Sequence, residues 1–191
     1  MTNVKNVFIV GVGGQGIILA GKVFSAGLVG AGYDVKMSEV HGMSQRGGNV
    51  TTQVRFGDKV YSPIIGKGEA HLILALEKME ALRWAEYLKP DGKIVLNDFA
   101  VPSAPILSGK AIYPENIVDS FKGKTDILIV KANDIAEELG NLKVTNMVMV
   151  GAMIKALDLS HIDWDEIIRR EVKEKFIDIN ILALKRGMEA I

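Results

Sequence analysis

The stretch that decides the fold is VFIVGVGGQGIILAGKVFSAGLVGAG, residues 7 to 32. Val7 to Val10 are β-branched or aromatic, as in a strand buried on both faces, whereas Ile17 to Val29 place apolar residues at helical spacing on more than one face. Between them, Gly11 to Gly16 have the G-x-G-x-x-G spacing of a tight turn that leaves the first helical N–H groups uncovered. We therefore predict a strand, a glycine-rich turn and a helix, with room for an anion at the turn.

Two other interpretations of this stretch were weighed. Its apolar character is compatible with a membrane span, but eight glycines and the central Lys22 are unfavourable in a helix that faces lipid. Alternatively, the glycines only let the strand and the helix pack closely, because G-x-G-x-x-G alone is weak evidence for a ligand. A binding turn and a packing turn both stay open at this point.

The composition fits a single domain over residues 1–191. Basic and acidic residues number 23 each, so no net charge indicates nucleic acid or a membrane surface as a partner. The chain has no cysteine, which excludes disulfides, thiolate nucleophiles and cysteine-ligated zinc or iron–sulfur clusters in these residues. The three histidines are far apart, so we expect no metal site, and without a processing signal of the usual form we expect a cytoplasmic protein.

The next segments predict a sheet that is mostly parallel. Residues 33–39 form a second strand, which would complete a βαβ unit. Glu39 lies 23 residues after Gly16, about where a nicotinamide-dinucleotide domain has the acid that contacts the ribose hydroxyls. An alternating segment at 49–56 and a short one at 59–61 predict an antiparallel hairpin inserted into the parallel scheme.

Capping signals mark the helices of the second half. Asp134 and Glu137 have capping-box spacing, and Thr145 can cap a strongly apolar helix. Asp163 with Glu166 begins an amphipathic helix. A buried strand is predicted at 70–76, and further strands are predicted at 93–97 and 127–130. The expected fold is therefore α/β, a three-layer, Rossmann-like and mostly parallel sheet with the inserted antiparallel hairpin and a helical carboxyl-terminal region.

A second loop, HGMSQRGG at residues 41 to 48, is polar, rich in glycine and too irregular for a helix or a strand. It combines a guanidinium, amide and hydroxyl groups and flexible backbone, which are the ingredients of a ligand loop. Arg46 is the best single candidate for a phosphate or carboxylate contact, because a guanidinium can make two parallel hydrogen bonds to either. The alternative role for Arg46 is a salt bridge that fixes its own loop.

Several segments together resemble a known family. They are GVGGQG at 11–16, SEVHGMSQRGG at 38–48, ELGN at 138–141, and the spaced Asn146 and Gly151. This set resembles the gamma-type domain of the 2-oxoacid:ferredoxin oxidoreductases, over about residues 5 to 188. The HGMSQRGG form of the second loop is typical of the small (beta) subunits of indolepyruvate ferredoxin oxidoreductases.

The resemblance implies a reaction and a division of labour. The family oxidatively decarboxylates a 2-oxoacid with thiamine diphosphate, removes electrons through iron–sulfur clusters and transfers the acyl group to coenzyme A. A large (alpha) partner subunit would hold the thiamine diphosphate, magnesium and iron–sulfur clusters, and the assembled enzyme would reduce ferredoxin. This chain would then hold no cofactor alone, which agrees with its lack of cysteine and of a G-D-G followed by paired asparagines.

The resemblance also implies which residues face the partner's active centre and help to admit or hold coenzyme A; none of them is expected to be catalytic. They come from the two loops: Gly11, Gly13, Gly14, Gln15 and Gly16 from the first, and Ser44, Gln45, Arg46, Gly47 and Gly48 from the second. We expect both loops at the carboxyl edge of the sheet, where open α/β folds bind ligands. We also expect that the isolated chain can form a homodimer, because a surface meant for a large partner would otherwise expose apolar area.

Two functions of other classes are compatible with the first loop. One is a self-sufficient NAD(P)- or flavin-dependent oxidoreductase built on the glycine turn and Glu39, and the other is a nucleotide-sensing module without chemistry. Against the first stands the second half of the chain, where the sequence shows no convincing acid–base constellation.

Overall fold

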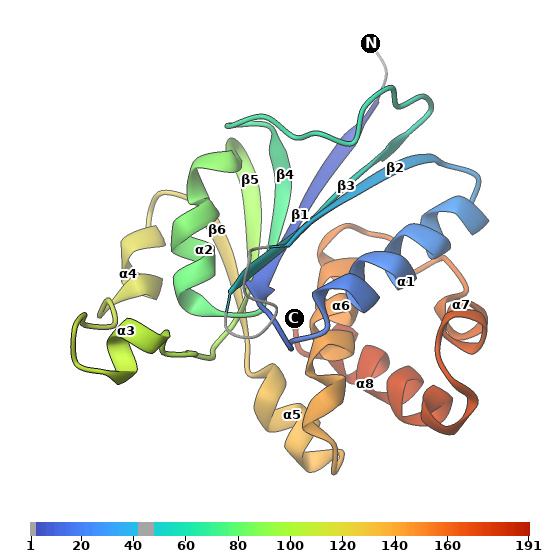
Figure 1. The fold of residues 1–191 in the computed structure, drawn as a ribbon. Helices are drawn as coiled ribbons and strands as arrows, with labels where there is room; N and C mark the ends of the chain where they lie inside the picture. Colours follow the sequence, from blue (N-terminus) through green and yellow to red (C-terminus); the bar gives the residue numbers. More distant parts are fainter. Residues whose placement is uncertain (1–2, 42–47) are drawn as a thin grey trace.

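The computed structural model describes residues 3–41 and 48–191. In these residues a six-stranded sheet has the order β2-β3-β1-β4-β5-β6 and is covered by helices on its two faces (Figure 1). The antiparallel strand β3 pairs with β1 and β2, whereas β1, β4, β5 and β6 pair in parallel. The prediction of a three-layer, mostly parallel α/β fold is confirmed. The strands are β1 (Lys5–Val12), β2 (Asp34–His41), β3 (Asn49–Gly57), β4 (Ala70–Ala75), β5 (Leu88–Asn97) and β6 (Asp126–Val130).

The helices divide between the two faces of the sheet. One face carries α1 (Ile17–Gly30), α5 (Ala132–Glu138), α6 (Thr145–Ala156), α7 (Trp164–Glu171) and α8 (Ile177–Glu189). The other face carries α2 (Lys78–Trp84) and α4 (Ile117–Phe121), with the short α3 (Ala104–Leu107) at the side of the molecule. Short 3-10 segments are η1 (Ala85–Tyr87), η2 (Leu142–Val144) and η3 (Glu174–Phe176). Among the described residues, no helix is both long and apolar enough to cross a membrane.

The alternation of side chains along β1 explains why the sheet has a core on each face. Val7 and Ile9 pack into the cluster that contains α1, α6 and α8, whereas Phe8 and Val10 pack into the cluster that contains α2 and α4. All four side chains are almost fully buried. Burying a side chain of this size stabilises the fold by about 1.5–3 kcal/mol, so the apolar run holds both helical layers on the sheet.

The antiparallel strand β3 pairs with other strands than the prediction gave it. β3 forms the hairpin with β2 across residues 42–48, and it then lies between β2 and β1. The segment predicted as the second half of the hairpin, Lys59 to Tyr61, is irregular and lies outside the sheet. Its central residue, Val60, is buried, and its N–H donates to the Asp34 carboxylate at 2.9 Å. The alternating segment is thus confirmed as a strand, β3, whereas the short segment after it is a loop whose apolar residue packs against the fold.

Of the three predicted helix caps, the structure shows the one at Asp163. Asp163 caps α7 as predicted, since its carboxylate accepts a hydrogen bond from the Glu166 N–H at 3.1 Å. Asp134 does not cap α5, because that helix begins at Ala132, directly after β6. Thr145 is the first residue of α6 rather than its cap, because η2 leads straight into the helix.

Two glycines let α6 and α8 pack with their backbones in contact. A Cβ atom at Gly151 would lie 2.0 Å from the Leu184 carbonyl oxygen, and one at Gly187 would lie 1.9 Å from the Val148 carbonyl oxygen. Neither contact can be relieved by a side-chain rotation, because the opposing atoms belong to the backbone. The buried, methionine-rich α6 is therefore held between the sheet and α8 at a distance that only glycine permits.

Replacing Gly151 by alanine should lower the free energy of unfolding by about 3 kcal/mol, because the added methyl group must push α8 away from α6. Urea unfolding followed by circular dichroism measures the change. The matched control is Gly30→Ala at the exposed end of α1, where the nearest atom would lie 3.5 Å from the new Cβ, so that the helix should gain up to about 1 kcal/mol. Equal stabilities of the two variants would contradict the close packing of α6 and α8.

Candidate functional site

A pocket of about 390 Å³ opens at the carboxyl edge of the sheet. It lies between the ends of β1 and β4, where β1 leads into α1 on one face and β4 leads into α2 on the other. This is the switch point at which open α/β sheets bind ligands. The pocket is lined by Gly14, Gln15, Gly16, Leu19, Leu76, Phe99, Asn133, Leu142, Lys143, Thr145 and Asn146.

The glycine turn leaves the beginning of α1 open toward this pocket. Gly14 and Gly16 have φ values of +101° and +76°, a conformation that side chains rarely adopt. A Cβ atom at Gly14 would meet no other atom within 4 Å, so the backbone there is accessible. Among the described residues, no side chain caps α1, and its first turn contains no acidic residue, so these residues leave the partial positive charge of the helix end available.

Gln15 fixes the turn against the neighbouring strand. Its Oε1 accepts a hydrogen bond from the Val12 N–H at 2.7 Å, and its Nε2 donates to the Leu76 carbonyl oxygen at 3.1 Å. Both ends of the amide are therefore engaged within the fold. The structure gives Gln15 a positioning role beside the pocket, and its predicted contact with a ligand stays a prediction.

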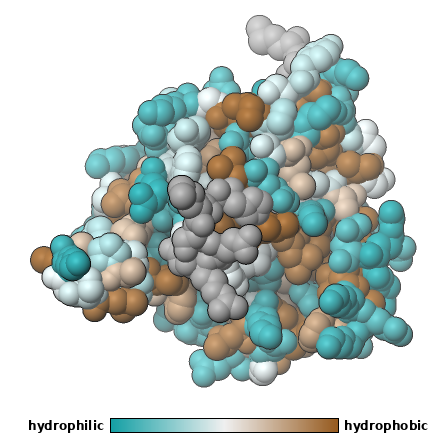
Figure 2. All heavy atoms as spheres, in the orientation of Figure 1, coloured by the Kyte–Doolittle hydropathy of each residue, from teal (hydrophilic) through white to brown (hydrophobic). Residues whose placement is uncertain are grey.

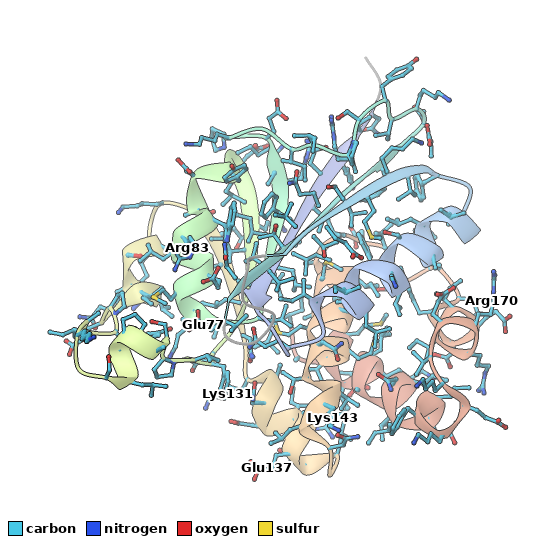
Figure 3. All side chains as sticks on the ribbon, in the orientation of Figure 1. Glu77, Arg83, Lys131, Glu137, Lys143 and Arg170 are labelled. Carbon is cyan, nitrogen blue, oxygen red and sulfur yellow. The ribbon has the colours of Figure 1, made fainter. Side chains whose placement is uncertain are left out.

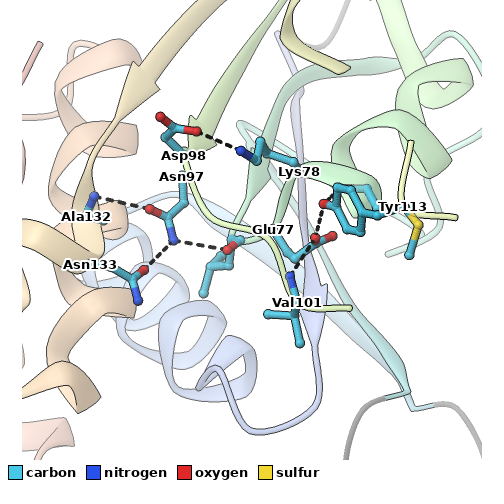
Figure 4. A network of polar contacts seen from close by, with 10 residues as sticks. Glu77, Lys78, Asn97, Asp98, Val101, Tyr113, Ala132 and Asn133 are labelled. Carbon is cyan, nitrogen blue, oxygen red and sulfur yellow. Dashed lines mark hydrogen bonds and ion pairs between the residues drawn. The ribbon is translucent and has the colours of Figure 1, made fainter. Parts of the chain in front are cut away.

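A second amide ties the remaining strand ends together below the pocket (Figure 4). The Asn97 side chain is fully buried at the end of β5, and its Nδ2 donates to the Leu76 carbonyl oxygen at 3.1 Å and to Asn133 Oδ1 at 2.9 Å. Its Oδ1 accepts from the Ala132 N–H at 3.2 Å. The Asn97 side chain thus connects the end of β4, the end of β5 and the start of α5.

Asn146 supplies an unused acceptor inside the pocket. The residue is only 2% exposed, and its Nδ2 donates to the Gly16 carbonyl oxygen at 3.0 Å. Its Oδ1 is buried and has no hydrogen-bond partner among the described residues. Leaving such an atom unsatisfied costs about 1–3 kcal/mol, which a ligand that donates a hydrogen bond would recover. Lys143, on η2 beside α5 (Figure 3), adds an exposed cation at the rim.

The predicted site residues divide into those inside and those outside the pocket. Gly14, Gln15 and Gly16 line it, whereas Gly11 packs below Gln15, whose Oε1 would lie 2.7 Å from a Cβ at Gly11. The Gly13 N–H donates to the Gly48 carbonyl oxygen at 2.8 Å, which joins the glycine turn to the end of the second loop. The remaining predicted residues, Ser44, Gln45, Arg46 and Gly47, lie outside the described residues.

Three asparagines in and beside the pocket, and the buried carboxyl group next to it, were not predicted as site residues. Asn97 and Asn133 belong to no motif, and Asn146 was noted only as part of the family resemblance. The one usable signal was the polar Asn97 directly after the apolar run Ile94 to Leu96. A polar residue at the carboxyl end of a buried strand is a frequent position for residues that organise a site.

Glu39 lies too far from the glycine turn for the role that a dinucleotide domain would give it. It pairs with Thr52 of β3, and Thr52 in turn pairs with Ile9 of β1. One whole strand therefore separates β2 from β1, which places Glu39 about 10 Å away across the sheet. The insertion of β3 removes the adjacency on which a ribose contact depends.

A buried carboxyl group, Glu77, organises the edge beside the pocket (Figure 4). Its Oε2 accepts from the Glu80 N–H at 2.9 Å and so caps α2, while its Oε1 accepts from the Val101 N–H at 3.1 Å and from the Tyr113 hydroxyl. The Tyr113 oxygen also accepts from the Met79 N–H at 3.2 Å. Burial and the hydrogen bond to Glu77 raise the pKa of Tyr113 above its usual range.

An open, mostly parallel α/β sheet with a glycine turn and a polar pocket at its switch point defines a Rossmann-like ligand-binding domain. A model of the family described as pyruvate ferredoxin/flavodoxin oxidoreductase matches residues 6–190, and the chain belongs to this family. It is a small subunit of a 2-oxoacid:ferredoxin oxidoreductase, as the resemblance implied, and neither a self-sufficient nucleotide-dependent oxidoreductase nor a nucleotide-sensing module is favoured.

Two curated relatives and one solved structure match this chain along nearly their whole length, and a second solved structure belongs to a longer chain. The chain is 40% identical to indolepyruvate oxidoreductase subunit IorB of Pyrococcus horikoshii over 97% of this chain and 95% of the relative, and 39% identical to the Thermococcus kodakarensis protein of the same name over the same shares. A solved structure of pyruvate oxidoreductase subunit PORC from Thermotoga maritima is similar with a TM-score of 0.75 at 20% identity, covering 97% of this chain and 96% of that one. The 2-oxoglutarate:ferredoxin oxidoreductase from Magnetococcus marinus, solved with 2-oxoglutarate, coenzyme A and succinyl-CoA bound, has a TM-score of 0.78 at 20% identity, covering 98% of this chain and 31% of that one.

Replacing Gln15 by leucine should destabilise the fold by about 1–3 kcal/mol, because the Val12 N–H loses its acceptor in a partly buried position. Chemical denaturation measures the loss. Lys143→Ala is the matched control, since it changes an exposed side chain of the same pocket and should stay within about 0.5 kcal/mol of the wild type. A Gln15 variant as stable as this control would refute the anchoring role.

The raised pKa of Tyr113 predicts a stability difference that depends on pH. Above pH 10.0 the unfolded chain releases the Tyr113 proton while the folded chain keeps it, so the folded state loses stability as pH rises. The difference in unfolding free energy between the wild type and Tyr113→Phe should be constant below that pH and shrink above it. Urea unfolding of both proteins between pH 8 and 11 checks this, and parallel curves throughout would rule out the raised pKa.

Proposed function

We propose that this chain is the small subunit of a cytoplasmic indolepyruvate (arylpyruvate):ferredoxin oxidoreductase that converts the oxoacid to an acyl-CoA. The observation that carries the proposal is the pattern of identities. The IorB subunits of P. horikoshii, T. kodakarensis and Archaeoglobus fulgidus are 38–40% identical to this chain along nearly their whole length. The 2-oxoglutarate synthase subunits KorC are only 29% identical. An aryl-substituted oxoacid is therefore the best supported substrate.

The cofactors of the proposed reaction belong to the partner. The chain contains no cysteine to ligate an iron–sulfur cluster. Within residues 3–41 and 48–191, no three histidine, aspartate or glutamate side chains lie close enough together to hold a metal ion. The chain thus lacks the cysteine ligands of an iron–sulfur cluster, and we assign the clusters, thiamine diphosphate and its magnesium ion to a large (alpha) subunit. Transfer of electrons to ferredoxin is assigned to the assembled enzyme.

For this chain we propose that the pocket at the carboxyl edge helps to hold coenzyme A. The molecule carries phosphate groups, which suit the open start of α1 and the Lys143 cation. It also carries N–H and O–H donors, one of which would satisfy Asn146 Oδ1. The accessible backbone at Gly14 lets a ligand approach closely. The residues of this chain would bind and orient the acyl acceptor, while the partner's cofactors supply the bond cleavage.

The second loop belongs to the same proposal. The Gly13 N–H donates to the carbonyl oxygen of Gly48, which directly follows Ser44, Gln45, Arg46 and Gly47 in the sequence, and this bond supports the proposal. We propose that Arg46 contacts a phosphate of coenzyme A or the carboxylate of the oxoacid.

Replacing Asn146 by aspartate should raise the KM for coenzyme A more than tenfold in the assembled enzyme. The new carboxylate would occupy the positive end of α1 itself, repel a phosphate and remove one neutral acceptor of the pocket. Asn180→Asp is the matched control, because Asn180 is also buried in a helix and donates to a backbone carbonyl, that of Phe176 at 2.7 Å, yet does not line the pocket. Steady-state kinetics with coenzyme A varied would decide, and equal KM values for the two variants would discard the pocket's role.

The experiment that tests the function is anaerobic affinity purification of the tagged chain from its native cells. We expect a large partner in equal amount, with thiamine diphosphate and iron–sulfur absorbance, that reduces ferredoxin when indolepyruvate and coenzyme A are added. Pyruvate or 2-oxoglutarate as the preferred substrate would overturn the aryl preference. A chain that is recovered alone with NAD(P) or flavin would overturn the whole proposal.

A further inference from the structure

Residues 102 to 112 form a projection, here called the arm, that the chain itself does not cover. The arm contains α3 and lies at the side of the molecule beside α4 (Figure 1). None of its residues is buried. Leu107 is 76% exposed and Ile112 is 89% exposed, and apolar surface is visible on this projection in Figure 2.

The composition of the arm differs from that of an ordinary surface loop. Its sequence is PSAPILSGKAI, in which Lys110 is the only charged residue, although 24% of the whole chain is charged. Depletion of charge with exposed large apolar side chains is typical of the centre of a protein interface. Leaving Leu107 and Ile112 in water forgoes about 1.5–3 kcal/mol each, which burial by a partner would recover.

The fold holds this apolar arm in a fixed shape. One oxygen of the fully buried Glu77 accepts from the Val101 N–H, just before the arm, and from the Tyr113 hydroxyl, just after it (Figure 4). The two ends of the arm are thereby closed on a single atom. Burying a carboxyl group is costly unless it is well hydrogen-bonded. The buried Glu77 carboxylate is hydrogen-bonded to both ends of the arm, and it thereby positions a segment that has no core contacts of its own.

The arm starts at the same edge of the sheet as the pocket. Phe99, three residues before the arm, lines the pocket, and its carbonyl oxygen accepts from the Lys78 N–H at 3.0 Å. A partner that approaches the pocket from this edge therefore also reaches the arm.

We infer that the arm is the docking element for the large subunit, an inference that rests on the proposed function. The lengths of the relatives favour this occupant over a second copy of the chain. The matching region makes up 35% of the ketoisovalerate oxidoreductase subunit VorA of Methanothermobacter thermautotrophicus and 31% of the M. marinus chain. In those proteins this fold is covalently joined to a larger polypeptide, whereas here the larger part must be held by contacts.

The test is a competition for assembly. Cells express the tagged large subunit together with equal amounts of the wild-type chain and the double variant Leu107→Asp/Ile112→Asp, and mass spectrometry measures both chains in the purified complex. Burying an unpaired carboxylate in place of an apolar side chain is costly, so the variant should make up less than a tenth of the incorporated chain. The control is Tyr61→Asp, because the Tyr61 side chain is 86% exposed. Tyr61 follows β3 at the edge of the sheet opposite to the pocket, where the last residues of β3 pair with the first residues of β1.

A second variant tests the clamp without changing the apolar surface. Tyr113→Phe removes the hydroxyl at one end of the arm, so amide hydrogen exchange across residues 102–112 should accelerate and incorporation should fall. Both variants are compared with the wild-type chain for melting temperature, which the double variant should leave unchanged because it alters only exposed side chains.

Three results would overturn the inference. The double variant could enter the complex as well as the wild type and Tyr61→Asp do. The double variant could enter the complex equally well but no longer self-associate in sedimentation experiments, which would show that the arm binds a second copy of this chain. If the wild-type chain itself joins no subunit with thiamine diphosphate and iron–sulfur absorbance, both the proposed function and this inference are wrong. If the wild-type chain joins such a subunit and the double variant joins it equally well, only the inference about the arm is wrong.

Discussion

The carbonyl oxygen of Leu76 is the point on which the site depends. It accepts hydrogen bonds from Gln15, which follows β1, and from Asn97, which ends β5, both at 3.1 Å. Three strand ends that are far apart in the sequence are thereby fixed at one backbone atom. The glycine turn, whose backbone would otherwise be among the most flexible of the chain, is held open at the beginning of α1. These two amides hold the strand ends beside the pocket, whose wall also contains Asn146 with its buried Oδ1, unpaired among the described residues.

The position of β3 is the second constraint. Because an antiparallel strand separates β1 from β2, Glu39, the residue that would contact a nucleotide ribose, is moved away, and the start of β3 lies beside the end of β1 instead. The bond between Gly13 and Gly48 joins the two loops. One inserted strand thus changes the chemistry available at the edge while both helical layers and both halves of the core stay in place.

Local patterns were sufficient to predict the fold but insufficient to predict the site. The apolar run Val7 to Val10 predicted a strand that is buried on both faces. The cap formed by Asp163 could also be predicted, because its carboxylate accepts from an N–H only three residues away. The pairing of β3 with β1 and the contact of Gln15 with Leu76 could not, since these partners lie far apart in the chain; Leu76 is 61 residues from Gln15. Asp134 has the right spacing for a cap, but the tertiary path of the chain after β6 starts α5 at Ala132. The role of Asn97 depends on where three strands end, which no single stretch encodes.

The clamp at Glu77 also affects how fast subunits can associate. A segment that becomes ordered only in the complex loses its conformational freedom at the moment of contact, and this loss reduces affinity. Here the two ends of the segment between Val101 and Tyr113 are closed when the chain folds, so part of this entropy is lost before any encounter. The chain can then associate as a rigid body, with a rate set by diffusion and orientation rather than by a folding step.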